Sequence, residues 1–402
     1  MSTTSARLGA RLAMPVALAL SSIVVVAQSH AVDVSQNFTV PNNNRLVVHG
    51  HGYGHGHGMS QYGAEGAARK GLNWKQILAF YYPGTKRSVQ RGKVKVQVSA
   101  NGGGAVQVSP RAGLRVRDHG AAKTWTLPSG KANRWRLKLD GKLRTVVQLR
   151  DANGWRTWRT LKGQASFRAA GKPITLWISG KATPYRGQLH YVGPANSKTR
   201  HTVNVIGINN YIRGVVPREM PATWSPNAVR AQAVAARTYA SYEMQHPRSA
   251  YYQLCDTVSC QVYGGVNSEH PASNAAVEAT HGVILTHGGK PAFTQFSSSS
   301  GGWTAANQFS YLRAQEDPYD DWAGNPVHDW KVPLTSAKIE AAWPSIGALK
   351  QIKVTSRDGN GEWNGRVRSL VLIGANARVT VSGDDFRYLM GLRSNWFTFK
   401  AK

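Results

Sequence analysis

One carboxylate stands out by its surroundings. Glu219 lies between Pro217 and Pro221, and Arg218 directly precedes it. Two prolines stiffen the backbone, which suits a side chain that must be held in position. An apolar neighbour such as Trp224 would raise the pKa of the carboxyl group and keep it protonated as a general acid, whereas Arg218 and a helix N-terminus would lower it. The sequence leaves open whether Glu219 is such an acid or is simply paired with an arginine.

Residues 49–58 alternate glycine with larger side chains. In an extended chain this alternation would place five side chains on one face: Tyr53 and the imidazoles of His49, His51, His55 and His57. Such a row could bind a metal ion, but no acidic residue accompanies it. We therefore expect no metal and no cofactor here. The favoured interpretation is a glycine-rich groove wall that carries one or two useful histidines.

Two further segments carry polar side chains at close spacing. Residues 297–300 are four serines followed by two glycines, and their hydroxyl groups could hydrogen-bond to a sugar. No glycine elbow of the kind that presents a nucleophilic serine surrounds them. Residues 316–321 form an acidic loop in a basic protein. Calcium binding is one interpretation of this loop, and a salt-bridged turn is the favoured one.

The N-terminus predicts export. Residues 1–31 combine two arginines, an uncharged apolar run at 12–27 and a small residue at 29 and 31, which is typical of a secretory signal peptide. A membrane anchor is the alternative, although the run is short for a span. No second long apolar run follows, so we expect a secreted protein of the cell wall or extracellular space, without a membrane span. Export argues against a nucleic-acid partner.

The predicted export to an oxidising environment bears on the state of the two cysteines. Cys255 and Cys260 enclose four residues, and an oxidising environment favours a local disulfide between them. Structural zinc is the alternative, but it would need two more ligands, and no histidine stands at a suitable spacing.

The composition describes the scaffold for these groups. The chain has 402 residues, 41% of them hydrophobic, and a formal net charge of +30, so it can form a packed core and should favour an anionic partner. Residues 86–200 carry 25 Lys and Arg against 3 Asp and no Glu, with five tryptophans interleaved. Alternating stretches separated by turn signals predict strands there. Such a lobe suits an anionic polymer, although a solvated strand face explains much of the same pattern.

We predict an α+β fold in which a mixed catalytic lobe is joined to this β-rich basic lobe. Outside 86–200, the expected elements are a polar linker over 32–44, a helix over 60–82, a strand over 203–211 leading into a loop, helices over 226–245 and 272–280, alternating strands and loops over 283–302, strands at 367–373 and 379–381, and a helical turn over 386–392.

Several of these segments match the signature of a known family. They span residues 50–399 and comprise 54–56, 58–64, 81–85, 185–187, 203–205, 211–221, 231–240, 260–265, 299–302 and 382–387. Together they resemble the SpoIID/LytB family of bacterial cell-wall proteins. The glycine-histidine block stands at the front here, whereas the better-known members have it near the C-terminal end, as in a circular permutation.

The resemblance implies work on peptidoglycan. Studied members are similar to lytic transglycosylases that cleave between N-acetylmuramic acid and N-acetylglucosamine in denuded strands, and others are described as enhancers of a cell-wall amidase. It implies that residues 45–85 belong with a catalytic core over 201–399. It makes Glu219 the catalytic acid/base and assigns substrate binding to six residues: His55, Gln61, Tyr62, Arg237, Ser299 and Ser300. Glycan strands, anionic wall polymers and an amidase are the partners we expect.

Overall fold

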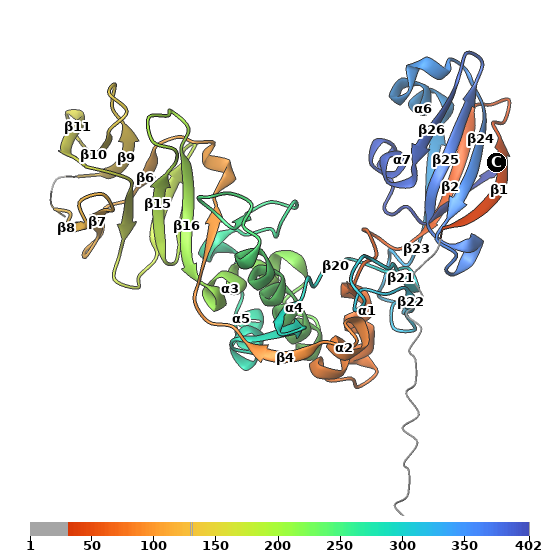
Figure 1. The fold of residues 1–402 in the computed structure, drawn as a ribbon, viewed down its shortest axis with the longest axis horizontal. Coiled ribbons are helices and arrows are strands. Elements are labelled where there is room, and N and C mark those ends of the chain that lie inside the picture. The colour runs from red at the N-terminus through yellow and green to blue at the C-terminus, as the bar shows by residue number, and fades with distance from the viewer. Residues whose placement is uncertain (1–30, 129, 131, 402) are drawn as a thin grey trace, which may run out of the picture.

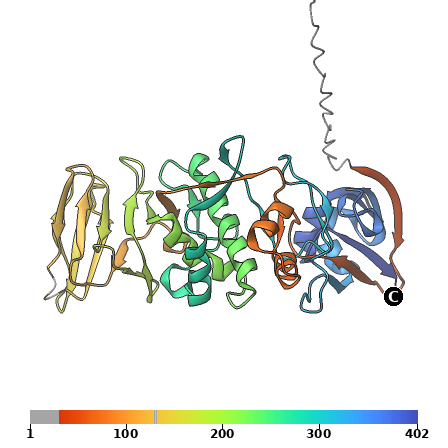
Figure 2. The same ribbon diagram turned by 90° about the horizontal axis from the view of Figure 1, so that it is seen from below.

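The computed structural model describes residues 31–128, 130 and 132–401, so the predicted signal peptide lies outside the described part except for its last residue. The chain forms an elongated α+β molecule, which confirms the predicted fold class. A β-rich lobe lies at one end, helices lie in the middle, and a second β-rich part lies at the other end (Figures 1 and 2). Three separate clusters of buried apolar side chains accompany this arrangement.

The first lobe contains two sheets packed face to face. The six-stranded sheet has the order β11-β10-β9-β6-β13-β14: Gly154–Thr160, Thr145–Asp151, Arg134–Leu139, Val106–Val108, Ile174–Ile178 and Lys181–Tyr185. The seven-stranded sheet has the order β17-β5-β16-β15-β12-β7-β8: Leu254–Cys255, Lys93–Gln97, His201–Gly207, Gln188–Val192, Ala165–Arg168, Arg115–Asp118 and Lys123–Thr126. Alternation decides which face is inside: in β9, Trp135 and Leu137 are buried between partly exposed basic side chains.

The helical middle is built around α4 (Pro226–Gln245), which begins and ends where the sequence predicts. Its many alanines are buried, so neighbouring helices can approach closely. The neighbours of α4 are α1 (Gln61–Arg69), α2 (Trp74–Tyr81), α3 (Ile208–Glu219) and α5 (Pro271–Ala279). Short strands complete this part: β3 (Met59–Ser60), β4 (Lys86–Val89), β18 (Val283–His287), β19 (Lys290–Pro291), β20 (Phe296–Ser297), β21 (Trp303–Thr304) and β22 (Gln315–Glu316).

Two predicted elements of the middle part are wrong in detail. The single helix expected over 60–82 is two helices, because Gly71 adopts a φ of +90° and Asn73 starts α2 with a capping box to Gln76. The loop expected after residue 211 is helix α3, whose last turn tolerates Pro217. Proline is unfavourable in a helix interior but is tolerated here close to the end of α3, so its presence does not exclude a helix.

The far end of the molecule has its own core. Its strands are β1 (Val32–Thr39), β2 (Arg45–His51), β23 (Asp329–Thr335), β24 (Leu349–Arg357), β25 (Val367–Gly374), β26 (Arg378–Ser382) and β27 (Phe397–Ala401), with helices α6 (Ser336–Ala342) and α7 (Gly383–Met390). Residues 32–39 are thus not a linker: β1 pairs antiparallel with β24, and its partly buried Val34 and Phe38 pack against this core. Within the described residues, no helix has both the length and the apolar character needed to cross a membrane.

Candidate functional site

Glu219 is the last residue of α3. Tyr211, Val215 and Val216 on this helix are buried against the core of the first lobe, which fixes the helix in position. Gly214 allows the ring of Tyr263 to approach, since a Cβ atom there would lie 2.6 Å from that ring. The helix thereby holds Glu219 at its C-terminal end, facing the segment that follows strand β17.

That segment is closed by the disulfide between Cys255 and Cys260, as the sequence predicted. The backbone N–H of Val262 donates a hydrogen bond of 3.2 Å to Oε1 of Glu219. Gln261 anchors the segment to two helices: its amide donates to the Ala236 carbonyl of α4 at 3.2 Å, and its oxygen accepts from the Tyr211 hydroxyl of α3 at 3.3 Å. The acid is therefore held by a covalently closed loop as well as by its own helix.

Burial raises the pKa of the Glu219 carboxyl group to about 7, from an ordinary 4.5. The hydrogen bond from Val262 and the charge of Arg218 act in the opposite direction but do not outweigh burial. The negative end of the α3 dipole also disfavours a carboxylate at this position. Near neutral pH the group is therefore poised between its two protonation states, as a general acid and base requires.

Glu219 opens into a pocket of about 270 Å³. The described residues that line it are His55, Glu219, Tyr239, Val258, Ser259, Cys260, Val262, Gln295 and Phe296. The structure thus brings two of the predicted site residues together, the acid and one histidine from far earlier in the chain. Of the other lining residues, Tyr239, Cys260 and Val262 lie in segments that carry the family resemblance, and Val258 and Ser259 lie between the two cysteines. Sequence reasoning gave none of them a role in a pocket; for Gln295 and Phe296 the signal is that they directly precede the serine run.

His55 is a neutral hydrogen-bond donor in this pocket. Its Nδ1 accepts the backbone N–H of His57 at 3.0 Å, which leaves the proton of the neutral ring on Nε2. Burial, followed by the neighbouring His57 and Arg366, lowers the pKa of His55 to about 3. The side chain can therefore donate a hydrogen bond from Nε2 without carrying charge.

The glycine-histidine block is not extended, so the expected single face does not form. Four glycines adopt positive φ angles in turn: Gly52, Gly54, Gly56 and Gly58. As a result His51 contacts Asp329 and Glu362, at 2.6 and 2.9 Å, whereas His57 lies against the Ala305 carbonyl. Within the described residues, no group of three or more His, Cys, Asp or Glu side chains is placed to hold a metal ion.

Gln61 and Tyr62 begin helix α1 but do not line the Glu219 pocket. Gln61 is buried, and its amide donates to Gln232 on α4 at 3.5 Å. The Tyr62 ring packs against Trp224 and Trp322, with ring centres 4.8 and 6.2 Å away. Gln61 therefore joins two helices, and Tyr62 belongs to a separate aromatic cluster.

Arg237, which the resemblance assigns to substrate binding, does not line the Glu219 pocket. The side chain is fully buried in α4. Its guanidinium donates to the side chain of Asn209 at 2.8 Å and to the carbonyls of Val283 and Val277 at 3.0 and 3.3 Å. These contacts tie α4 to α3, α5 and β18, so the residue serves the scaffold.

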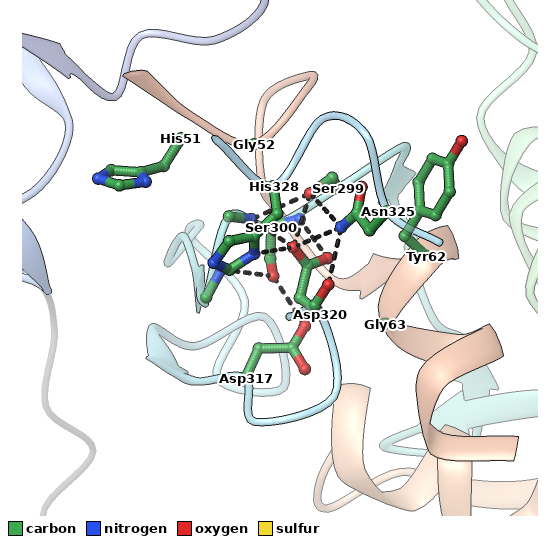
Figure 3. A network of polar contacts seen from close by, with 12 residues as sticks. His51, Gly52, Tyr62, Gly63, Ser299, Ser300, Asp317, Asp320, Asn325 and His328 are labelled. Atoms are coloured by element: carbon green, nitrogen blue, oxygen red, sulfur yellow. Dashed lines mark hydrogen bonds and ion pairs between the residues drawn. The ribbon is translucent and has the colours of Figure 1, made fainter. Parts of the chain in front are cut away.

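Ser299 and Ser300 are also structural, contrary to the sequence-based expectation. Both are buried, and their hydroxyls donate to Asp320 and Asp317, at 2.6 and 2.8 Å (Figure 3). Asp320 also accepts hydrogen bonds from Asn325 and His328. The two serine hydroxyls are therefore committed to carboxylates and unavailable to a sugar.

The acidic loop is explained by the same network. Burial, followed by the charge of Asp320, raises the pKa of Asp317 to about 7. Burial also acts to raise the pKa of Asp320, but hydrogen bonds from His328, Ser299 and Ser60 outweigh it and hold that pKa below its usual value. One protonated and one ionised carboxyl group thus share the interior of the loop, which makes it a hydrogen-bonded anchor beneath the glycine-histidine block.

The fold and the site together define an α+β protein whose pocket holds one partly buried carboxyl group near its point of half-protonation. Residues 196–287, which include Glu219 and its disulfide-closed loop, match the sequence profile of SpoIID, stage II sporulation protein. This part of the chain therefore matches a SpoIID domain, and the chain is similar to proteins of that family.

Curated relatives agree with that assignment. The chain is 36% identical over 140 residues to the amidase enhancer of Bacillus subtilis (strain 168), a match that covers 33% of this chain and 19% of that protein. It is 29% and 28% identical to the stage II sporulation protein D of Bacillus amyloliquefaciens and of Bacillus subtilis (strain 168). Those two matches cover 52% of this chain and 64% of each relative, so the chain spans less than two thirds of the relatives it matches.

Proposed function

We propose that this protein acts on the bacterial cell wall and cleaves peptidoglycan glycan strands between N-acetylmuramic acid and N-acetylglucosamine without water. Glu219 is the general acid and base of the reaction. The observation that carries the proposal is the partly buried Glu219 carboxyl group, with a pKa of about 7, in a pocket that also receives the neutral His55.

The reaction needs only one carboxyl group if that group acts twice. Protonated Glu219 first donates its proton to the glycosidic oxygen as the bond from that oxygen to C1 of the muramic acid breaks. The C6 hydroxyl of the same sugar then attacks C1 and gives its proton to the Glu219 carboxylate. The products are a new free hydroxyl on one strand and a 1,6-anhydro end on the other, and the acid is regenerated.

The lining of the pocket supports this reaction over hydrolysis. A hydrolase uses two carboxyl groups about 5 to 9.5 Å apart, the second one acting as nucleophile or activating a water molecule. Among the described residues that line this pocket, Glu219 is the only acidic one. An attacking hydroxyl supplied by the substrate removes the need for a second carboxylate.

Other lining residues suit a sugar ring. Phe296 offers an aromatic surface against which the apolar face of a pyranose can pack, and Val258 forms an apolar lip that is 89% exposed. The Nε2–H group of His55 can donate to an oxygen of the sugar. We assign His55 to substrate positioning, and Glu219 alone to proton transfer.

A second function is favoured by one relative. The protein with 36% identity is named amidase enhancer, so this chain could bind glycan and stimulate an amidase without cleaving strands itself. In that case the pocket would recognise glycan, and the exposed Val258 would be part of a contact with the amidase.

Glycan cleavage, glycan binding and amidase stimulation, each measured for the parent and a Glu219→Gln variant, distinguish the two functions. The change keeps the shape of the side chain and an acceptor for the Val262 N–H, but it removes the transferable proton. We expect cleavage of denuded glycan to fall about 10²- to 10⁴-fold while glycan binding is kept. Stimulation of an added amidase by both forms, with no cleavage by either, would instead establish the enhancer function.

A further inference from the structure

The outer face of the seven-stranded sheet carries a trough of about 430 Å³ that the proposed reaction does not use. It runs across six adjacent strands, from β5 to β8, and each strand contributes to its lining. The residues that carry the argument are Lys93, Gln188, Arg168, Arg115 and Thr124. We call this feature the basic trough; none of its lining residues is acidic.

Strand register brings the cations together. Arg168 on β12 lies directly opposite Arg115 on β7, so both point to the same face. Arg117 lies two residues along β7 from Arg115, a spacing of about 7 Å, and Lys95 lies at the same spacing from Lys93 on β5. Both side chains therefore extend the positive face. Like charges placed directly opposite each other destabilise a sheet, so this arrangement is unfavourable without an anion.

The nearest acid does not neutralise the face. Asp118 follows Arg117, but its side chain is buried on the opposite side of β7. Its carboxylate accepts hydrogen bonds from the backbone N–H groups of Gly120, Ala121 and Lys162 at 2.9, 3.1 and 2.7 Å. The charge of Asp118 is therefore committed to the turns beside the sheet.

Arg168 in the trough and His190 beside it are partly withdrawn from solvent and lie close to other cations. The Nε of Arg168 is buried and has no hydrogen-bond partner within the described structure. Burial, and then the charge of Arg117, lowers the pKa of Arg168. Beside it, burial, followed by His119 and the cations Arg168 and Lys95, lowers the pKa of His190 to about 3. The buried donor without a partner fits a site that is complete only with an anion.

We propose that the basic trough binds the phosphate groups of an extended polyol-phosphate chain. Donors reach the trough from several strands, which suits a tetrahedral phosphodiester, because its two charged non-bridging oxygens point in different directions from phosphorus, whereas one arginine fork already satisfies a planar carboxylate. The length of the trough suits a chain with repeated charges. The lining offers no aromatic ring for stacking bases, and the Trp125 ring of β8 lies on the inner face beside buried Val116, which argues against single-stranded nucleic acid.

Binding of a labelled poly(glycerol phosphate) oligomer to the chain without its first 31 residues tests this proposal by fluorescence anisotropy over a series of salt concentrations. The test variant is Arg115→Gln/Arg168→Gln. The matched control is Arg150→Gln/Lys181→Gln, which removes two exposed cations from the six-stranded sheet of the same lobe. The readout involves no glycan cleavage, so it is independent of Glu219.

We expect the trough variant to bind about tenfold more weakly or worse, with a shallower salt dependence, and the control to change by about twofold or less. Circular dichroism of both variants verifies that the lobe is folded. Equal losses in the two variants would overturn the proposal, since they would mean that diffuse charge holds the polymer. Equal affinity for a polygalacturonate or a single-stranded DNA oligomer of matched charge would overturn the assignment to polyol phosphate.

Discussion

Replacing Glu219 by glutamine should stabilise this protein at alkaline pH although it removes the catalytic acid. A carboxyl group with a pKa of about 7 in the folded protein and 4.5 in the unfolded chain binds its proton more tightly when folded. Below about pH 4.5 both states are protonated and the effect vanishes. Between about pH 4.5 and 7 the unfolded chain ionises while the folded protein keeps its proton, so the folded state loses stability with rising pH, and above pH 7 the loss levels off at about 3 kcal/mol. Glutamine avoids that cost and still accepts the hydrogen bond from Val262.

Thermal unfolding at pH 4, 6 and 8 measures this effect. We expect Glu219→Gln to match the parent at pH 4 and to melt roughly 5 to 10 °C higher at pH 8. The control is Glu278→Gln, which removes a carboxylate from an exposed ion pair with Arg213 and should shift the midpoint little at any pH above 5. A Glu219→Gln midpoint at or below that of the parent at pH 8 would refute the view that burial governs this carboxyl group.

Three further predictions follow from the same contacts. The rate of glycan cleavage should fall above about pH 7 as Glu219 ionises, and no limb near pH 6 should arise from His55, whose pKa is about 3; a pH–rate profile that loses activity between pH 7 and 6 would contradict this assignment. A Cys255→Ser/Cys260→Ser variant should lose about 2 kcal/mol of stability and lower kcat more than it raises KM, because the closed loop carries the N–H that holds the acid; urea unfolding and steady-state kinetics check both parts, and an unchanged kcat would rule out the positioning role. Asp320→Ala should destabilise the protein by about 3 to 5 kcal/mol, because it leaves buried donors and His328 without their partner; a loss below about 1 kcal/mol in denaturant titrations would show that the network is dispensable.

Local signals predicted much of the scaffold. Helix α4 was predictable because Pro226 can occupy the first helical position and the residues that follow are rich in alanine. The alternation in β9 and β10 follows from the period of a strand, and the disulfide follows from two cysteines close together in a chain that looks exported. The position of Glu219 between two prolines marked the acid, although its helix was taken for a loop.

Long-range contacts account for what the sequence did not reveal. Strand β1 looked like a linker because its partner, β24, lies near the other end of the chain. Ser299 and Ser300 looked like sugar ligands because nothing nearby indicates that Asp317 and Asp320 fold back onto their hydroxyls. A buried network and a free polar cluster have the same composition, and only the tertiary fold distinguishes them.

The pKa of Glu219 could not be decided from sequence for a similar reason. Arg218 stands beside it in the chain but is exposed, so its charge is screened. Burial in the pocket comes from residues far apart in the sequence, including His55 and Phe296. The glycine-histidine block failed as an extended row because alternate glycines turn the backbone, which sends one imidazole into the pocket and the others elsewhere.

The central claim is that Glu219 breaks the glycosidic bond without water. Mass spectrometry of the products formed from denuded glycan strands in ¹⁸O-labelled water tests this claim most directly. We predict 1,6-anhydro-muramic acid ends that contain no label and that disappear with the Glu219→Gln variant. Reducing ends that carry the ¹⁸O label, or unlabelled anhydro ends that persist in the variant, would contradict the account.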